Sequence, residues 1–147
     1  MISTRLLCAA AALAVAPAAS AQPDPGGAAD RTPAAVVDHH MKALAAGDLD
    51  GLVSDYADDA VLISPGQTAE GKDALRSVYE GMIESKADPK PVFKALKIWG
   101  QGDIGFVSWE IDQGDKAQSN GTDAFLVRHN RILVQSVFQG VGPPAEQ

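Results

Sequence analysis

The sequence is poor in several features that proteins use for stabilisation or recognition. Its 147 residues include one cysteine, which excludes an internal disulfide, and no Cys/His set has the spacing of a structural zinc site. Acidic residues outnumber basic ones and the net charge is −7, which argues against nucleic-acid or anionic-membrane partners, because both require clustered positive charge. There is also no Gly-rich phosphate-binding motif. The sequence therefore predicts neither a bound metal nor a cofactor.

Long hydrophobic runs are also missing, except at the start of the chain. Residues 1–21 combine a short basic start, an apolar run and the small-residue ending Ala19-Ser20-Ala21, which is typical of a secretory signal peptide. A buried alanine-rich helix is the alternative. The run is too short for the ~20 residues of a membrane span. Cleavage after Ala21 would remove Cys8 and place the remaining 126 residues in the periplasm or outside the cell.

One domain is expected after this segment. Residues 22–33 are rich in Pro, Gly and Ala and are interpreted as a flexible linker, and residues 141–147 as a disordered tail. The domain between them covers residues 34–140, which is long enough to build a genuine hydrophobic core.

Three helices are predicted from the spacing of apolar residues. The first begins at Thr32-Pro33 and ends at Gly47, and a short second helix covers about 49–56. The third, 71–86, has a clear apolar stripe. The acidic cluster Asp55, Asp58 and Asp59 is interpreted as a solvated loop, because it lacks calcium-loop spacing.

Strand-like runs follow the third helix at regular intervals, after one short strand at 61–63. Asn120-Gly121 indicates either a bulge in a long strand or, as an alternative, a hairpin turn. Helices followed by antiparallel strands predict an α+β fold with helices on one face of a bent sheet. The runs after the third helix are 91–99, 104–111, 117–128 and 131–138.

The stretch ALAAGDLDGLVSDYADDAVL, residues 43–62, resembles the opening of the nuclear-transport-factor-2-like (NTF2-like) superfamily. It is similar to ketosteroid isomerases and to SnoaL-like polyketide cyclases. Residues 107–110 and 122–125 resemble later parts of the same pattern, so that the match covers about 34–139. The resemblance implies an NTF2-like cone, with three N-terminal helices packed on a strongly curved, mainly antiparallel sheet. It also implies a conical pocket and a homodimer formed through the sheet face.

The resemblance places the three cavity positions of ketosteroid isomerases on residues of this chain. The tyrosine position falls on His40, the general-base position on Ser64 and the protonated-aspartate position on Asp123. A serine hydroxyl is not basic enough to abstract a carbon-bound proton alone. True steroid isomerase activity is therefore not expected. In SnoaL-like cyclases a cavity aspartate serves as acid and base, and Asp123 is similarly placed.

Asp123 and His40 are the candidate catalytic residues. By strand alternation Asp123 shares an apolar face with Phe125, where burial would raise its pKa; the alternative is an exposed residue at a strand start. His40 lies in an apolar helix stripe. It is either a core residue satisfied by one hydrogen bond or a polar pocket group paired with Asp123.

Four further residues are predicted to line the pocket: Ser64, Val107, Trp109 and Gln135. Trp109 shares a strand face with Val107, and its indole would stack on a flat ligand. Core packing or a dimer contact is the alternative for Trp109. We expect an exported domain that binds a small hydrophobic molecule, with isomerase or cyclase chemistry left open. A non-catalytic dimerisation or protein-interaction module is the alternative function.

Overall fold

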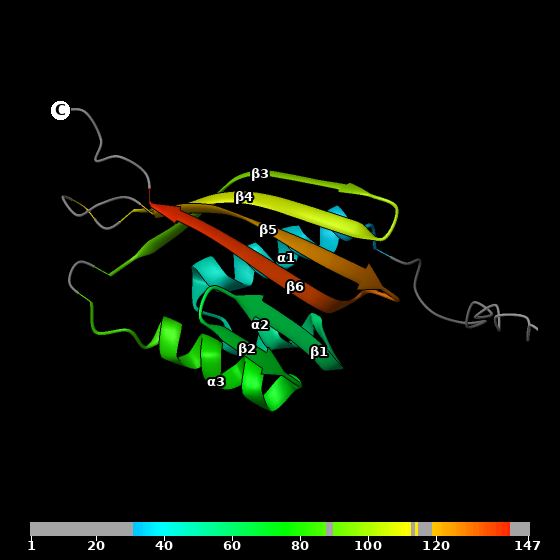
Figure 1. Cartoon of the computed structure of the whole chain (residues 1–147), viewed down its shortest axis with the longest axis horizontal. Coiled ribbons are helices and arrows are strands. Elements are labelled where there is room, and N and C mark those ends of the chain that lie inside the picture. Colours follow the sequence, from blue (N-terminus) through cyan, green and yellow to red (C-terminus); the bar gives the residue numbers. More distant parts are fainter. Residues whose placement is uncertain (1–30, 88–89, 113, 115–118, 142–147) are drawn as a thin grey trace, which may run out of the picture.

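The structure, a computed structural model, describes residues 31–87, 90–112, 114 and 119–141 (Figure 1). The predicted signal peptide, the predicted linker up to residue 30 and the predicted tail from residue 142 lie outside these residues. All three stay predictions. The mass of the N-terminal peptide of the purified protein would test the predicted cleavage after Ala21. Within the described residues, no helix is both long and apolar enough to cross a membrane.

Within these described residues, three helices and six strands form an α+β domain with a single curved, mostly antiparallel sheet (Figure 1). The sheet has the strand order β2-β1-β6-β5-β4-β3. All neighbouring strands are antiparallel except β1 and β6, which are parallel. Along the chain the elements are α1 (Pro33–Ala46), α2 (Leu49–Ser54), β1 (Tyr56–Ser64), β2 (Gln67–Glu70), α3 (Lys72–Ile83), β3 (Val92–Gln101), β4 (Ile104–Asp112), β5 (Ser119–Arg128) and β6 (Arg131–Val141).

The first helix has the ends that its sequence predicts. The Thr32 hydroxyl accepts a hydrogen bond from the backbone N–H of Ala35, and Pro33 occupies the first turn. Gly47 closes α1 with a left-handed φ of 69°. The Asp48 carboxylate then caps α2 by accepting from the backbone N–H of Gly51 at 2.9 Å.

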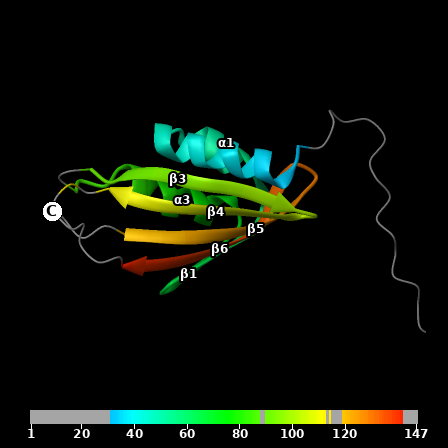
Figure 2. The same cartoon turned by 90° about the horizontal axis from the view of Figure 1, so that it is seen from above.

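The helices lie on one face of the sheet, and no helix from the described part of the chain covers the other face (Figure 2). Helix α1 packs over β3, β4 and β5, whereas α3 packs over β1 and β2. The core between the helices and the sheet is mainly apolar. Its largest fully buried side chains include Tyr56, Phe125, Leu52, Leu75 and Ile132.

The three N-terminal helices implied by the resemblance were wrong, and one strand was not predicted. Helix α3 follows β1 and β2 along the chain, so the helices are not all N-terminal. Strand β2 was not predicted, because its sequence Gln-Thr-Ala-Glu has no apolar alternation; it forms by pairing with β1 after the Pro65-Gly66 turn. Strand β1 also begins earlier than expected, at Tyr56, which places that tyrosine in the sheet and not in α2.

Asn120-Gly121 is neither a bulge nor a turn. Both residues lie inside β5, and the ladder between β4 and β5 is unbroken from Ile104 to Ile111. A register shift occurs later in the strand, between Leu126 and Val127. The predicted turn at His129-Asn130 is confirmed, with positive φ at both residues.

Candidate functional site

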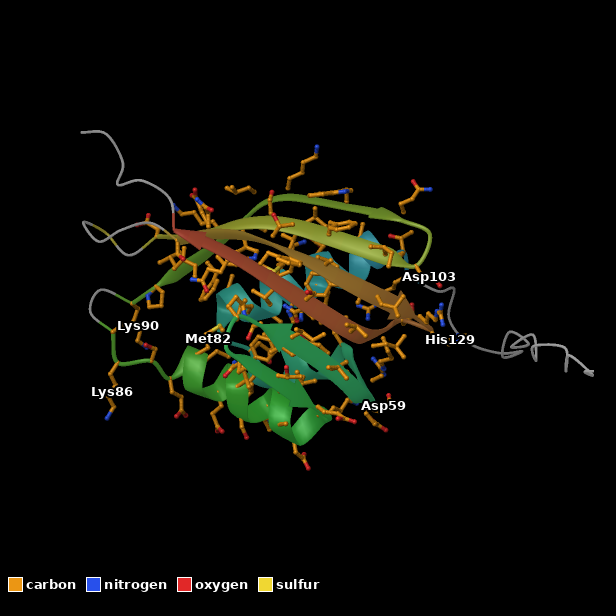
Figure 3. The ribbon with its side chains drawn as sticks, viewed as in Figure 1. Asp59, Met82, Lys86, Lys90, Asp103 and His129 are labelled. Carbon is orange, nitrogen blue, oxygen red and sulfur yellow. The ribbon has the colours of Figure 1, made fainter. Side chains whose placement is uncertain are left out.

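A cavity of about 260 Å³ lies between the helices and the covered face of the sheet. Helix α1 contributes Met41 and Leu44 to its wall, and α3 contributes Val78, Tyr79 and Met82. Figure 3 shows Met82 near the end of α3, close to the sheet. The remaining lining residues are Leu62, Ser64, Pro65, Gln67, Phe93, Trp109, Ile111, Asp123, Gln135, Val137 and Gln139.

The polar centre of this cavity is the carboxylate of Asp123. Trp109 donates from Nε1 to its Oδ1 at 2.8 Å, and Gln135 donates from Nε2 to its Oδ2 at 2.7 Å. Asp123 is only 5% exposed, and it is one of the residues that line the cavity. The remaining access to this carboxylate is therefore from the cavity.

Two buried tyrosines extend the network beyond Gln135. The Tyr79 hydroxyl donates to Gln135 Oε1 at 2.8 Å, and the Tyr56 hydroxyl donates to the same oxygen. The two hydroxyl oxygens are 2.6 Å apart. Because both tyrosines donate into Oε1, the Gln135 amide is held with its N–H₂ group toward Asp123.

Sheet register explains why these side chains meet. Trp109 lies opposite Gly121, Asp123 lies opposite Val137, and Gln135 lies opposite Phe125. These positions alternate along their strands and point to the covered face. The carboxylate, the amide and the indole thus come from three adjacent strands.

Gly121 makes room for the Trp109 indole. A Cβ atom at Gly121 would lie 2.4 Å from Trp109 Cζ2 and 2.4 Å from the Phe138 carbonyl oxygen. Any other residue would displace the indole or the backbone of β6. The glycine that resembles a turn signal in the sequence is therefore required by the packing of a cavity side chain.

Burial is the main cause of the pKa shifts in this network. It raises the pKa of Asp123, while hydrogen bonds from Trp109 and Gln135 oppose that rise. Burial likewise raises the pKa of Tyr56 and Tyr79 far above neutral pH, so both tyrosines are uncharged donors. Asp123 alone in this network changes charge at accessible pH.

His40 lies behind the cavity and is not among the residues that line it. Its ring is fully buried and makes edge contacts with the rings of Tyr56, Tyr79 and Phe125, at centroid distances of 5.4, 5.8 and 5.5 Å. Neither ring nitrogen has a hydrogen-bond partner among the described residues. His40 thus has neither of the two polar partners considered for it, a single core hydrogen bond or Asp123.

The other predicted pocket residues divide into two groups. Ser64, Trp109 and Gln135 line the cavity together with Asp123, whereas Val107 is fully buried in the core and does not line it. Sequence reasoning missed the contribution of Tyr79. The sequence does contain an indication of this role: Tyr79 lies in the apolar stripe of α3, and a buried tyrosine hydroxyl usually forms a hydrogen bond.

Asp55 is a buried, ion-paired residue and does not lie in a solvated loop, so that expectation was wrong. The carboxylate is 1% exposed and accepts from Arg31 at 3.1 Å and from His39 Nδ1 at 2.7 Å. Asp58 and Asp59 are exposed on β1, and Asp58 pairs with Lys72. These contacts connect Arg31, which precedes α1, and His39, which lies within α1, to Asp55, which directly precedes β1. Among the described residues, no group of three or more His, Cys, Asp or Glu side chains is placed to hold a metal ion.

Known proteins show the same architecture. An NTF-2 like protein of unknown function from Burkholderia xenovorans matches with 21% identity and a TM-score of 0.62, covering 76% of this chain and 84% of that one. A putative polyketide cyclase from Sinorhizobium meliloti has 21% identity and a TM-score of 0.59, with 70% and 93% covered. A putative ketosteroid isomerase from Kribbella flavida has 15% identity and a TM-score of 0.65, with 78% and 83% covered.

These identities are low, so the similar structures establish the fold alone. Among curated proteins, none matches this sequence. The family described as the SnoaL-like domain, however, matches residues 37–135, which contain most of the cavity wall. The chain therefore belongs to the SnoaL-like domain family and has the fold of NTF2-like proteins.

Proposed function

We propose that the cavity binds a small, mainly apolar molecule and that Asp123 is its principal polar contact. The observation that carries this proposal is an open apolar cavity with a buried carboxylate at its polar centre. Small-molecule sites have this composition, with a mostly apolar lining and a few fixed polar groups. The cavity lies near the lower end of the usual range of ~300–1,000 Å³, which favours a small ligand.

Acid–base chemistry of the isomerase or cyclase type is included in the proposal, with Asp123 as the group that gives or takes the proton. Its raised pKa brings its titration closer to neutral pH, as general acid–base catalysis requires. Ser64 supplies no second base, and its hydroxyl donates to the Gln67 carbonyl at 3.4 Å. Identification of small molecules that co-purify with the protein would supply the substrate for a rate measurement on Asp123→Asn.

Ligand binding is tested by filling the cavity. Val137 lines the cavity, whereas Val134 pairs with Leu126 and points to the uncovered face of the same strand. We expect Val137→Phe to weaken binding of 2-naphthol about tenfold or more, because the added ring occupies the ligand's volume. Binding is followed by the NMR signal of the Trp109 indole N–H.

Val134→Phe is the matched control and is expected to change the affinity less than about twofold. Equal affinity in both variants would show that the probe binds elsewhere, and the proposed pocket would be rejected. Assignment of the signal is simple, because the chain has two tryptophans and Trp99 lies on the uncovered face.

The uncovered face of the sheet is the proposed homodimer surface. Cross-strand pairing aligns Trp99, Phe106, Ala124, Ser136 and Ile63 in one row across five strands. Trp99 is 40% exposed and Ile63 is 46% exposed. Phe138, in the next row of this face, is 65% exposed. Exposed apolar side chains grouped in this way mark interaction surfaces.

Sedimentation velocity tests this surface. We expect the wild-type protein to sediment as a dimer and Phe138→Lys to sediment as a monomer, because a lysine at the interface would be desolvated. The control is Leu96→Lys, since Leu96 is 59% exposed but borders the groove beside α1. A wild-type monomer at every concentration would refute the dimer without affecting the pocket.

A further inference from the structure

Among the described residues that line the cavity, Asp123 supplies the one carboxyl group. Among the described residues that line it, there is no Lys, Arg or His. The two titratable groups are Tyr79, which stays neutral, and Asp123. An anionic ligand would therefore meet no positive side chain and one carboxylate.

Both oxygens of the Asp123 carboxylate accept hydrogen bonds. The indole N–H of Trp109 can only donate, and so can the amide N–H₂ of Gln135. A carboxylate has about four acceptor sites, of which these bonds use two. The sites that remain are free to accept hydrogen bonds from a group in the cavity.

No residue in the described part of the chain supplies a cation to balance this carboxylate. The described ion pairs do not include Asp123, and its side-chain partners Trp109 and Gln135 are both neutral. The tyrosines beyond Gln135 are neutral as well. A buried carboxylate without a counter-charge is costly, so a cation that enters the cavity gains more there than it would at a solvated surface.

The rest of the cavity suits the apolar body of such a cation. Phe93, Tyr79 and Trp109 supply aromatic rings, which attract cations as well as apolar groups. Met41 and Met82 add polarisable thioethers. The net charge of −7 also favours the approach of cations over anions.

We propose that the cavity selects an apolar organic cation, whose protonated amine donates a hydrogen bond to Asp123. This inference rests on the proposed ligand-binding function and specifies the ligand class. The ammonium would take the vacant acceptor positions of the carboxylate, and the hydrocarbon part would lie among the aromatic and methionine side chains. A neutral ligand of the same shape would leave the carboxylate without its counter-charge.

The test compares three probes of the same ring and different charge: benzylamine, which is protonated at pH 7, benzyl alcohol and benzoate. Affinities are measured from the Trp109 indole N–H signal, with Trp99 as the internal reference. We expect benzylamine to bind about tenfold or more tightly than benzyl alcohol, because its hydrogen bond is charge-assisted. Benzoate should bind most weakly.

Asp123→Asn should reduce the preference for benzylamine to within about twofold. Asp103→Asn removes the same charge at the far end of the sheet (Figure 3) and should leave the preference unchanged. If Asp123→Asn does not fold, the same preference is measured on the wild-type protein at decreasing pH. Acid that protonates Asp123 should weaken benzylamine and not benzyl alcohol.

The outcomes separate the two proposals. Equal affinity for benzylamine and benzyl alcohol would overturn the cation inference and leave the apolar pocket standing. A preference for benzylamine that persists in Asp123→Asn, or that does not weaken in acid, would also overturn it. Failure of all three probes to shift the Trp109 signal would reject the pocket itself.

Discussion

Replacing Gln135 with leucine is expected to lower the free energy of unfolding by about 3 kcal/mol. The amide connects Asp123 to Tyr56 and Tyr79 through hydrogen bonds at both of its ends. Leucine would leave Asp123 with one donor. The two tyrosine hydroxyls would lose their shared acceptor and keep only each other as partners, so that one of the two hydroxyl protons would be unpaired. Unpaired polar groups at buried positions each cost about 1–3 kcal/mol. Urea denaturation followed by tryptophan fluorescence measures the change.

Gln139→Leu is the matched control for this experiment. Gln139 also lines the cavity, but it is exposed, and its amide donates to the Ser119 hydroxyl in an exposed hydrogen bond. We expect its loss to cost less than about 0.5 kcal/mol. Equal effects of the two substitutions would mean that the buried network contributes no more to stability than an exposed hydrogen bond.

Replacing His40 with leucine is expected to make the protein less sensitive to acid. Burial lowers the pKa of His40 from 6.5 to about 4. Between these values the unfolded chain binds a proton that the folded protein excludes, so the free energy of unfolding falls as pH falls below 6.5. The loss is about 1.4 kcal/mol per pH unit and is complete below the folded pKa.

From pH 7.5 to pH 4.5, the stability of His40→Leu should therefore rise relative to wild type by about 2.5 kcal/mol. At pH 7.5 we expect the variant to be at least as stable as wild type, because leucine has no unpaired nitrogen in this apolar site. Denaturation curves at both pH values provide the measurement. His129→Asn is the control, since His129 is exposed in a turn far from the cavity (Figure 3) and its positive φ suits asparagine. A pH dependence shared by both variants would exclude His40 as its source.

Much of the fold followed from local signals in the sequence. Thr32-Pro33 and Gly47 marked the ends of α1, and apolar periodicity located α3 and the four later strands. Strand β2 did not follow, because its hydrogen bonds come from pairing with β1 and its side chains carry no pattern. The placement of Tyr56 in β1 likewise depends on pairing with residues that are far away in the sequence, including Ile132.

The site was predictable where strand alternation decides which way a side chain points. Alternation placed Asp123 on an apolar face, and the resemblance turned the face of Trp109 toward the cavity. The register of Gln135 was not fixed by the sequence, and the structure brings all three side chains together. The aromatic surroundings of His40 were not predictable, because a helix stripe gives the direction of a side chain but not the neighbours that it meets. Gly121 was misinterpreted, because the feature that requires glycine is the Trp109 indole on the adjacent strand.

The parallel pairing of β1 with β6 has a consequence for the order in which the domain assembles. Leu62 in β1 pairs with Gln135 in β6, which is far away in the sequence. Strands β1 and β2 and helix α3 can therefore join the sheet only after β6 has formed. Pairings between such distant segments are slow, because a long loop must close first. The cavity spans this seam, with Tyr79 on one side and Asp123 on the other. We therefore expect the cavity to close late in folding, and a ligand that touches both side chains to slow amide hydrogen exchange in α3.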